Sequence, residues 1–408
     1  MAALIRDLLH SQFASLDANS PNYAVEVVER LLAQSRRVGA SDVHLVPAAD
    51  GLDVGFRMDG VLQAAARLPR TAAGNVIARL KVLAELLTYR TDVPQEGRIR
   101  AVRDEVEMRV STFPTVFGEK AVVRLFAGSE RYQRLEDLGL PEDVRGPLGR
   151  LLEETSGAIL ATGPAGSGKT TTIYACMRDV AFRSAGSRSL VSLEDPVEVI
   201  VPGVAQSQVN PGVQFDLLTG LRFLMRQDPE VIMVGEVRDR ATAEAAFGAS
   251  LTGHLLLSTF HAGSAAEAVS RLGDMGIEPY LLQSGLLAIL CQRLVRRLCG
   301  CARRSSAVED RLGLPVSEVW LPGGCEECNG TGYRGRFVLV EMLIPERSSV
   351  GRAILSRSDA ASIERLAIEA GMVSRWQRAY AAVGEGRTSP AEIRRVLGFS
   401  TPGEKPEA

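Results

Sequence analysis

The chain has 408 residues, which is enough for two domains of ordinary size. Its composition, 46% hydrophobic and 24% charged, is ordinary for a globular protein, and its net charge of −2 gives no sign of nucleic-acid binding. Residues 1–10 show no cleavage-site pattern, and no apolar run reaches membrane-spanning length. We therefore expect a cytoplasmic protein that binds no nucleic acid and meets a membrane only through partners.

The first 127 residues predict a flexible lead at residues 1–22 and then an α+β domain at residues 23–127. From Tyr23 onward apolar residues recur at helical spacing, and a second helix is predicted at Ala72–Leu87. Strands are predicted at Asp42–Val46, Val54–Met58, Arg98–Val102, Glu105–Ser111 and Ala121–Phe126. A polar linker over residues 128–137 follows.

A phosphate-binding loop opens the second domain, which is predicted at residues 138–400 as a doubly wound α/β fold. The pattern G-x-x-x-x-G-K-[ST] lies between an apolar strand and the start of a helix, so its backbone N–H groups can close around phosphates. Its predicted nucleotide-binding residues are Gly163, Pro164, Ala165, Gly166, Ser167, Gly168, Lys169, Thr170 and Thr171. Lys169 would reach the β- and γ-phosphates, and the Thr170 hydroxyl would hold Mg²⁺.

Lysine is rare in this chain, with four lysines beside 43 arginines, yet the loop has Lys169. A compact ammonium fits between phosphates where a planar guanidinium would not. The surrounding pattern makes chance placement of this lysine the weaker explanation.

Four strands are predicted in this domain, at Ile159–Thr162, Leu190–Leu193, Val231–Val234 and Leu255–Thr259. The first leads into the phosphate-binding loop, and polar residues follow the other three. Glu194 and Asp195 follow the second, Glu236 the third and His261 the fourth. Ligands of open α/β sheets bind at the carboxyl ends of strands, where acidic groups can orient the attacking water and support Mg²⁺. A single glutamate there is more often a solvated cap, but two after a phosphate-binding loop favour catalysis.

The chain is predicted to be helical from about Ile344. Ser389, Pro390 and Glu392 form a capping pattern at the start of its last helix. Residues 401–408 are predicted to be a disordered tail.

Six cysteines fit a reducing compartment. Cys176 and Cys291 lie in apolar stretches that we interpret as helical, and we expect buried thiols there. The other four cluster within residues 299–336, as Cys299, Cys301, Cys325 and Cys328. Four thiolates from two short loops suit a tetrahedral Zn²⁺ site, with free buried thiols as the alternative.

These motifs resemble those of the secretion ATPase superfamily that powers type II secretion and type IV pilus assembly. Ser192 to Glu198 resembles its Asp box, Arg226 to Asp239 its atypical Walker B segment, and Thr252 to His261 its His box. The first domain adds matching segments, namely Ala40–His44, Arg57–Gly60, Pro94–Arg98, Arg109–Thr112 and Gly118–Lys120. The similarity extends from about residue 23 to residue 400.

The resemblance implies a homohexameric ATPase with a PAS-like first domain and a RecA-like second domain, which bind ATP between them. Arg98 and Arg109 would be arginine fingers on the phosphates, whereas Arg124 is equally well explained as a surface arginine. His261 would contact the γ-phosphate, and His44 would be structural. The tetracysteine insert implies an assembly-type motor attached to the inner membrane through a platform protein.

Two departures from the family pattern leave alternatives open. His261 is followed by Ala262 and Gly263 in place of Thr-Asn, and Ala241 replaces a glutamate. These departures keep a nucleotide-binding scaffold with weakened hydrolysis as an alternative to an assembly motor. A pilus-retraction ATPase is a second alternative, which loss of bound zinc would favour. A RecA-like DNA motor is disfavoured, because the chain lacks a basic, aromatic-rich path for a strand.

Overall fold

The computed structural model describes residues 13, 16–17, 20–99, 108–125, 132–345 and 349–399. The chain forms two compact units. The first comprises Met1–Gly128, Arg296–Ser305 and Trp320–Arg336, and the second comprises Ser129–Val295, Ser306–Val319 and Phe337–Ala408. Most of the predicted lead, the first four residues of the predicted linker and the whole predicted tail lie outside the described residues.

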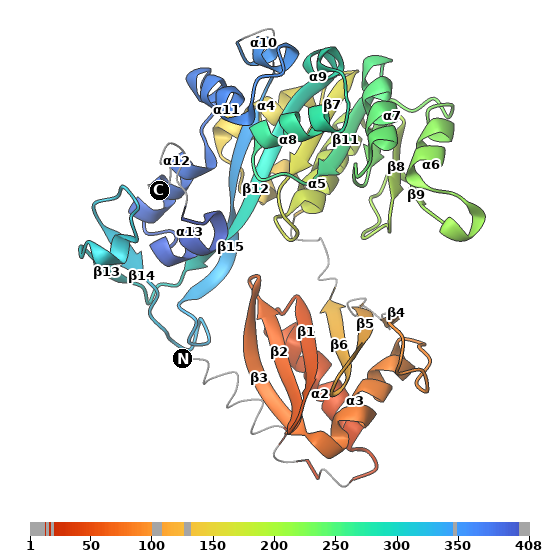
Figure 1. The fold of residues 1–408 in the computed structure, drawn as a ribbon, viewed down its shortest axis with the longest axis vertical. Coiled ribbons are helices and arrows are strands. Elements are labelled where there is room, and N and C mark those ends of the chain that lie inside the picture. Colours follow the sequence, from red (N-terminus) through yellow and green to blue (C-terminus); the bar gives the residue numbers. More distant parts are fainter. Residues whose placement is uncertain are drawn as a thin grey trace. The chain divides into compact units, whose positions relative to one another are not determined.

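A six-stranded antiparallel sheet with two helices forms most of the first unit (Figure 1). Its strand order is β3-β2-β1-β6-β5-β4. The strands are β1 (Asp42–Ala48), β2 (Gly51–Met58), β3 (Val61–Pro69), β4 (Gln95–Ile99), β5 (Met108–Thr115) and β6 (Gly118–Leu125). Helices α2 (Tyr23–Arg37) and α3 (Arg70–Leu83) share a core with alternate strand residues such as Val43 and Leu45. The α+β prediction is therefore confirmed, whereas the PAS-like likeness stays a prediction.

Strand β3 was not predicted, because Ala64, Ala65 and Ala66 in its middle give no clear alternation of apolar and polar residues. The two predicted helices are present, although α3 ends four residues before the predicted Leu87. The predicted strands at 98–102 and 105–111 lie partly outside the described residues.

A seven-stranded sheet forms the centre of the second unit, in the order β15-β12-β7-β11-β10-β8-β9. From β12 to β9 all neighbouring strands pair in parallel. The strands are β7 (Gly157–Thr162), β8 (Leu190–Glu194), β9 (Ala205–Gln208), β10 (Val231–Val234), β11 (Leu255–Phe260), β12 (Leu286–Leu298) and β15 (Tyr333–Leu343). The four predicted strands are thus confirmed within one or two residues.

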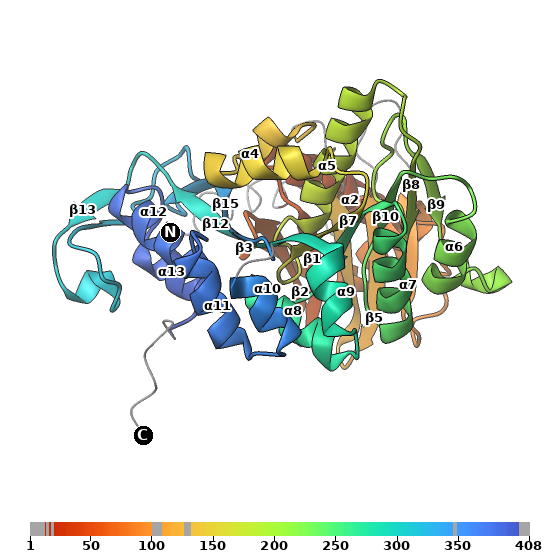
Figure 2. The same ribbon diagram turned by 90° about the horizontal axis from the view of Figure 1, so that it is seen from above.

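Helices cover both faces of this sheet (Figure 2). On one face α4 (Glu142–Leu151) and α5 (Lys169–Ser184) pack against Ile159 and Ala161. On the other face Leu160 and Leu193 share a core with α6 (Leu217–Leu224), α7 (Arg240–Leu251), α8 (Ala265–Asp274) and α9 (Pro279–Gly285). This is the predicted doubly wound arrangement, since strands buried on both faces alternate between two cores.

The C-terminal part is helical, as predicted. It contains α10 (Ser349–Leu355), α11 (Ala360–Glu369), α12 (Arg375–Gly384) and α13 (Pro390–Leu397). Ser389 Oγ accepts a hydrogen bond from the Glu392 N–H at the start of α13, which confirms the predicted cap. Short elements complete the described chain: η2 (Leu135–Leu138), η3 (Pro211–Val213), η4 (Glu309–Arg311), β13 (Arg303–Ser305) and β14 (Val319–Leu321).

The two isolated cysteines are both buried, as expected, but only Cys176 lies on a helix. The helical interpretation of the region around Cys291 was wrong, because this residue lies in β12. A short apolar run fits a buried strand and a buried helix equally well. Within the part of the chain that the structure describes, no helix is long and apolar enough to cross a membrane.

Candidate functional site

The phosphate-binding loop joins the end of β7 to the start of α5, as predicted. Gly163 has φ of 144°, and a Cβ atom there would lie 2.5 Å from both the Gln292 carbonyl oxygen and Ser167 Oγ. Glycine is therefore required at the first loop position. Gly168, with φ of 92°, is the residue before the first helical residue, so the N–H groups of the first turn of α5 open onto the loop.

Lys169 is the first residue of α5, and its side chain folds back under the loop. Its Nζ donates hydrogen bonds to the carbonyl oxygens of Gly163 (3.0 Å) and Pro164 (3.1 Å). Burial lowers the pKa of Lys169, and the nearby Glu236 carboxylate opposes this shift. The ammonium therefore sits at the centre of the loop, where a phosphate chain would replace its carbonyl partners.

A cavity of about 240 Å³ brings the predicted strand ends together with this loop. Its polar lining comes from four segments of the second unit: Ala165, Gly166, Lys169 and Thr170; Glu194, Asp195 and Glu198; Gly235, Glu236 and Arg238; and Thr259 and His261. The sequence thus predicted correctly that these strand ends converge.

Glu236 contacts a histidine and an arginine at the cavity. His261 Nε2 lies 2.6 Å from its Oε1, and Arg238 Nε lies 2.7 Å from its Oε2. The hydrogen bond to Glu236 raises the pKa of Arg238. Both partners are about half exposed, whereas the Glu236 side chain is only 17% exposed. The carboxylate is thus held at the cavity by two side chains that solvent or ligand can reach.

Glu194 has a different environment, because donors from two buried side chains and one partly buried side chain occupy both of its oxygens. Oε1 accepts hydrogen bonds from Ser192 Oγ (2.5 Å) and Gln206 Nε2 (3.0 Å), and Oε2 accepts one from the Tyr174 hydroxyl. Burial and the Glu194 carboxylate raise the pKa of Tyr174, so its hydroxyl stays protonated and donates. Glu194 therefore ties β8 to α5 and β9.

The loop that carries His261 is held through its backbone. The Gly263 N–H donates to Glu267 Oε2 (2.7 Å), and the Gly263 carbonyl accepts from Arg293 (2.8 Å). Arg271 donates to the His261 carbonyl. A Cβ atom at residue 263 would lie 2.4 Å from Glu267 Oε2, so the departure from the family's asparagine suits this loop.

The two other described histidines, His254 and His44, lie outside the nucleotide cavity. His254 Nδ1 lies 3.0 Å from the Ala249 carbonyl oxygen at the end of α7. Burial, followed by the charge of Arg57, lowers the pKa of His44, which keeps this imidazole neutral.

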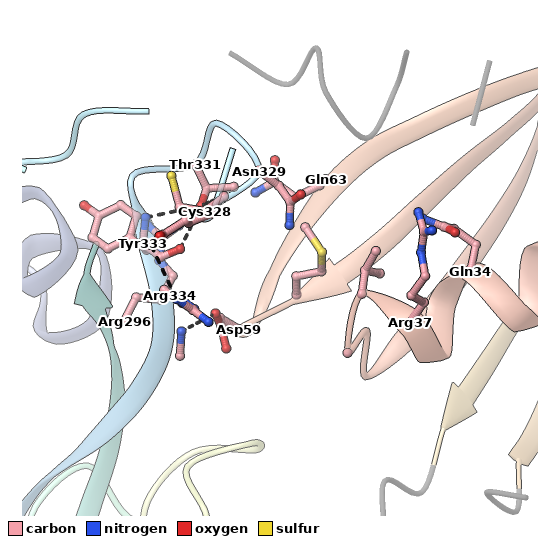
Figure 3. Close-up of a pocket in the computed structure, with 15 residues that line it drawn as sticks. Gln34, Arg37, Asp59, Gln63, Arg296, Cys328, Asn329, Thr331, Tyr333 and Arg334 are labelled. Atoms are coloured by element: carbon pink, nitrogen blue, oxygen red, sulfur yellow. Dashed lines mark hydrogen bonds and ion pairs between the residues drawn. The ribbon is translucent and has the colours of Figure 1, made fainter. Parts of the chain in front are cut away.

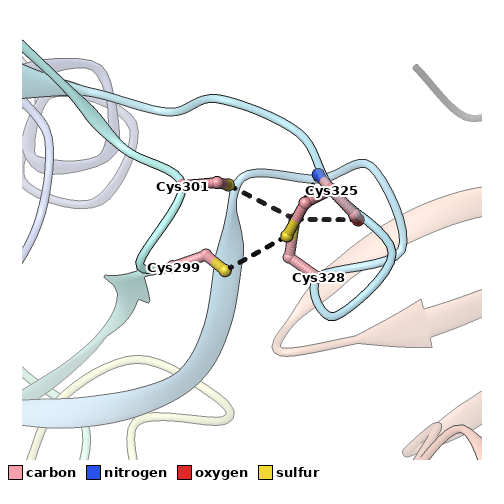
Figure 4. A group of neighbouring side chains, drawn as sticks. All are labelled: Cys299, Cys301, Cys325 and Cys328. Atoms are coloured by element: carbon pink, nitrogen blue, oxygen red, sulfur yellow. Dashed lines mark hydrogen bonds between the residues drawn. The ribbon is translucent and has the colours of Figure 1, made fainter.

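The four clustered cysteines bring their sulfur atoms together (Figure 4). All four Sγ atoms lie within 4.8 Å of one another. The Sγ–Sγ distances are 3.7 Å for Cys299–Cys325 and for Cys325–Cys328, and 3.8 Å for Cys301–Cys328. Burial disfavours the Cys328 thiolate, but hydrogen bonds from the N–H groups of Cys325 and Gly332, both 3.2 Å from its sulfur, and from the Cys325 and Cys301 thiols together lower its pKa to about 6.

The predicted arginine fingers are neighbours on the sheet of the first unit. Arg98 on β4 lies directly opposite Arg109 on β5, and Arg109 lies opposite Arg124 on β6. Glu96 forms an ion pair with Arg109, and Asp42 forms one with Arg124 (2.9 Å). Three arginines thus share one row across adjacent strands.

A larger cavity of about 800 Å³ lies within the first unit (Figure 3). Residues of α2, the β2–β3 turn and the tetracysteine segment line it, and Asp59 Oδ2 accepts a hydrogen bond from the Gly335 N–H (2.9 Å). Of the predicted site residues only Cys328 borders this cavity. It therefore adds nothing to the nucleotide site.

Several residues of the site were not predicted from the sequence. Arg238 lies inside the Walker B segment, and its spacing from Glu236 could have revealed it. Tyr174, Arg271 and Arg293 carry no such local signal, because their partners are ten or more residues away.

Comparison with known proteins identifies the family of the chain. Residues 17–395 match the family model described as Type II/IV secretion system protein. The chain is 41% identical over 390 residues to the Type II secretion system protein E of Aeromonas hydrophila, an alignment that covers 93% of this chain and 77% of that protein. It is 38% identical over 381 residues to the Type II secretion system ATPase E of Vibrio cholerae serotype O1, covering 91% and 75%.

Two solved structures share the fold. The ATPase DotB of Legionella pneumophila aligns with a TM-score of 0.66 at 20% identity and covers 90% of this chain and 94% of its own. The pilus retraction motor PilT with bound ADP aligns with a TM-score of 0.54 at 22% identity, covering 86% and 96%. The chain therefore belongs to the Type II/IV secretion system protein family.

Proposed function

We propose that this protein is an ATPase motor that powers assembly of a type II secretion pseudopilus or a type IV pilus. The observation that carries the proposal is the single cavity in which the phosphate-binding loop faces Glu236 and His261. Relatives named Type II secretion system protein E and ATPase E, which align with most of the chain, support the biological setting.

The phosphates would bind between the loop and the strand ends. Lys169 would leave its carbonyl partners and bind the β- and γ-phosphates, and the hydroxyl of Thr170, a residue that lines the cavity, would hold Mg²⁺. When bound, Mg²⁺ neutralises charge on the phosphate oxygens. His261, which also lines the cavity, would contact the γ-phosphate.

Glu236 is the better candidate to orient the attacking water. Its two partners are exposed and can exchange for water and phosphate, whereas two of the three partners of Glu194, Ser192 and Tyr174, are buried. We therefore assign the water to Glu236, and we assign to Glu194 the role of holding the segment after β8.

Arg98 and Arg109 would act as arginine fingers when the first domain closes over the nucleotide in a homohexameric ring. The Arg98–Arg109–Arg124 row gathers three guanidinium groups at one place on the sheet, and Glu96 and Asp42 pair with two of them. A polyphosphate carries negative charge that suits such a row of arginines, which supports the proposed role.

The tetracysteine cluster fits Zn²⁺. Four sulfurs at about 2.3 Å from a tetrahedral ion lie about 3.8 Å apart, close to the distances found here. We assign Zn²⁺ to Cys299, Cys301, Cys325 and Cys328. Since the family resemblance associates this insert with assembly, it also favours assembly over retraction.

The proposal predicts that Lys169→Ala abolishes ATP turnover and weakens nucleotide binding. Glu236→Gln should keep binding and lower turnover by about a hundredfold or more, because it leaves the phosphate contacts intact. Both are measured by phosphate release and by titration with a fluorescent ADP analogue. Turnover within a few-fold of the parent for either variant, or a parent that binds but never hydrolyses ATP, would refute the motor and favour the scaffold.

A further inference from the structure

Glu341, on β15, is a wholly buried carboxylate that contacts two helices at once. Oε1 accepts hydrogen bonds from the Ala265 N–H (2.9 Å) and from Arg375 NH1 (2.8 Å). Oε2 accepts one from the Arg375 N–H (3.1 Å). No part of the Glu341 side chain is exposed to solvent.

The two backbone N–H groups that donate to Glu341 both belong to the first residue of a helix. Ala265 is the first residue of α8, and Arg375 is the first residue of α12. The first N–H groups of a helix have no partner within it, and they carry the positive end of the helix dipole. One buried negative charge therefore holds the N-termini of α8 and α12 together, and the Arg375 guanidinium balances that charge.

The α8 end of this bridge adjoins the His261 loop. Only residues 262–264 separate His261 from Ala265, and the Gly263 N–H is already fixed by Glu267 of α8 itself. A shift of the N-terminus of α8 would therefore move this loop, and with it the His261 imidazole that pairs with Glu236.

The α12 end belongs to the C-terminal helices. Arg375 also lies 3.8 Å from Glu364 of α11, and α11 contacts α8. Burial raises the pKa of Glu364 despite this arginine. The bridge is thus the place where charged groups of α11 and α12 meet the helix that follows the His261 loop.

We propose that Glu341, with Arg375, is a positioning residue through which helices α11 and α12 set the His261 loop and thereby the rate of ATP hydrolysis. This inference rests on the proposed ATPase function. Glu341 does not border the nucleotide cavity, so it acts through the N-terminus of α8 and does not contact nucleotide.

The test compares Glu341→Gln and Arg375→Met with the control Arg365→Met in the full-length protein. Arg365 forms an exposed pair with Glu369 on α11, so its loss should be neutral. Glu341→Gln keeps an oxygen that can accept from one helix but loses the charge. Both test variants should lower kcat about tenfold or more with KM for ATP nearly unchanged, because small displacements of catalytic groups lower rates steeply.

Two further measurements separate positioning from simple unfolding. Saturating ADP should raise the melting temperature of each variant as much as it raises that of the parent, and Arg375→Lys should recover part of the lost kcat. The inference is overturned if kcat of the folded variants matches that of Arg365→Met, or if kcat and ADP affinity fall together. If Glu341→Gln does not fold, Arg375→Met decides by the same criteria.

These outcomes are distinct from failure of the proposed function. If the parent hydrolyses ATP and Lys169→Ala does not, the function stands whatever the Glu341 variants show. A parent without turnover would refute the function first.

Discussion

Lys81 and Glu119 form a buried ion pair in the first unit, and removing the lysine should cost much of that unit's stability. Lys81 Nζ donates to both oxygens of Glu119 (2.8 and 3.0 Å) and to the Arg90 carbonyl oxygen (2.7 Å). The Lys81 side chain is 0% exposed and that of Glu119 is 7% exposed. All three ammonium hydrogens are therefore used away from water.

Lys81→Met would leave a buried carboxylate and a carbonyl without their donor. Breaking a buried pair by removing one partner typically costs about 3–5 kcal/mol, a large part of the 5–15 kcal/mol that stabilises an ordinary domain. In Lys81→Met/Glu119→Leu neither charge remains. The double variant should therefore lose less than the sum of the single variants, by about 1 kcal/mol or more.

The assay is urea unfolding of the full-length protein, with hydrogen exchange of α3 and β6 peptides to assign the transition to the first unit. Lys120→Met is the matched control, because Lys120 follows Glu119 on β6 and its side chain is partly exposed. If Lys81→Met unfolds within about 0.5 kcal/mol of Lys120→Met, the buried pair does not stabilise this unit.

Two further predictions concern the other sites. Purified protein should contain one zinc ion per chain by metal analysis, and Cys325→Ser should release it with ADP binding little changed; a metal-free protein of full stability would remove zinc from the proposal. Arg98→Ala and Arg109→Ala should each lower turnover strongly and leave ADP affinity nearly unchanged, since fingers act on charge that develops in the transition state. Arg67, which pairs with two exposed aspartates, is the control, and turnover of the finger variants equal to that of Arg67→Ala would exclude domain closure as the catalytic switch.

The central features of the second unit could be predicted because their signals are local. The β7 strand, the phosphate-binding loop and α5 are consecutive, and each of β8, β10 and β11 is a short, mainly apolar run. A glutamate or histidine is the last residue of the strand or follows within two residues of its end. Strand β9, Ala205–Gln208, was missed because this polar edge strand has no apolar run.

The contacts that distinguish the two glutamates could not be predicted, because they join residues far apart in sequence. From the sequence, Glu194 is as good a catalytic candidate as Glu236. Only the fold shows that Tyr174 and Gln206 donate hydrogen bonds to the Glu194 oxygens. The same reason hid the bridge at Glu341, whose donors lie 76 and 34 residues away. Sequence patterns identify which polar groups lie at strand ends, but only the packed fold shows which of them are already satisfied.

Lysine is scarce in this chain, and Lys81 and Lys169 are buried, so few of its amines can react with an amine-directed reagent. Among the described residues only Lys120 offers an amine that is not largely buried. A nucleotide seated on the loop would cover the Lys169 amine further. The extent of acylation at Lys169, read by peptide mass spectrometry against that at Lys120, would therefore report nucleotide occupancy.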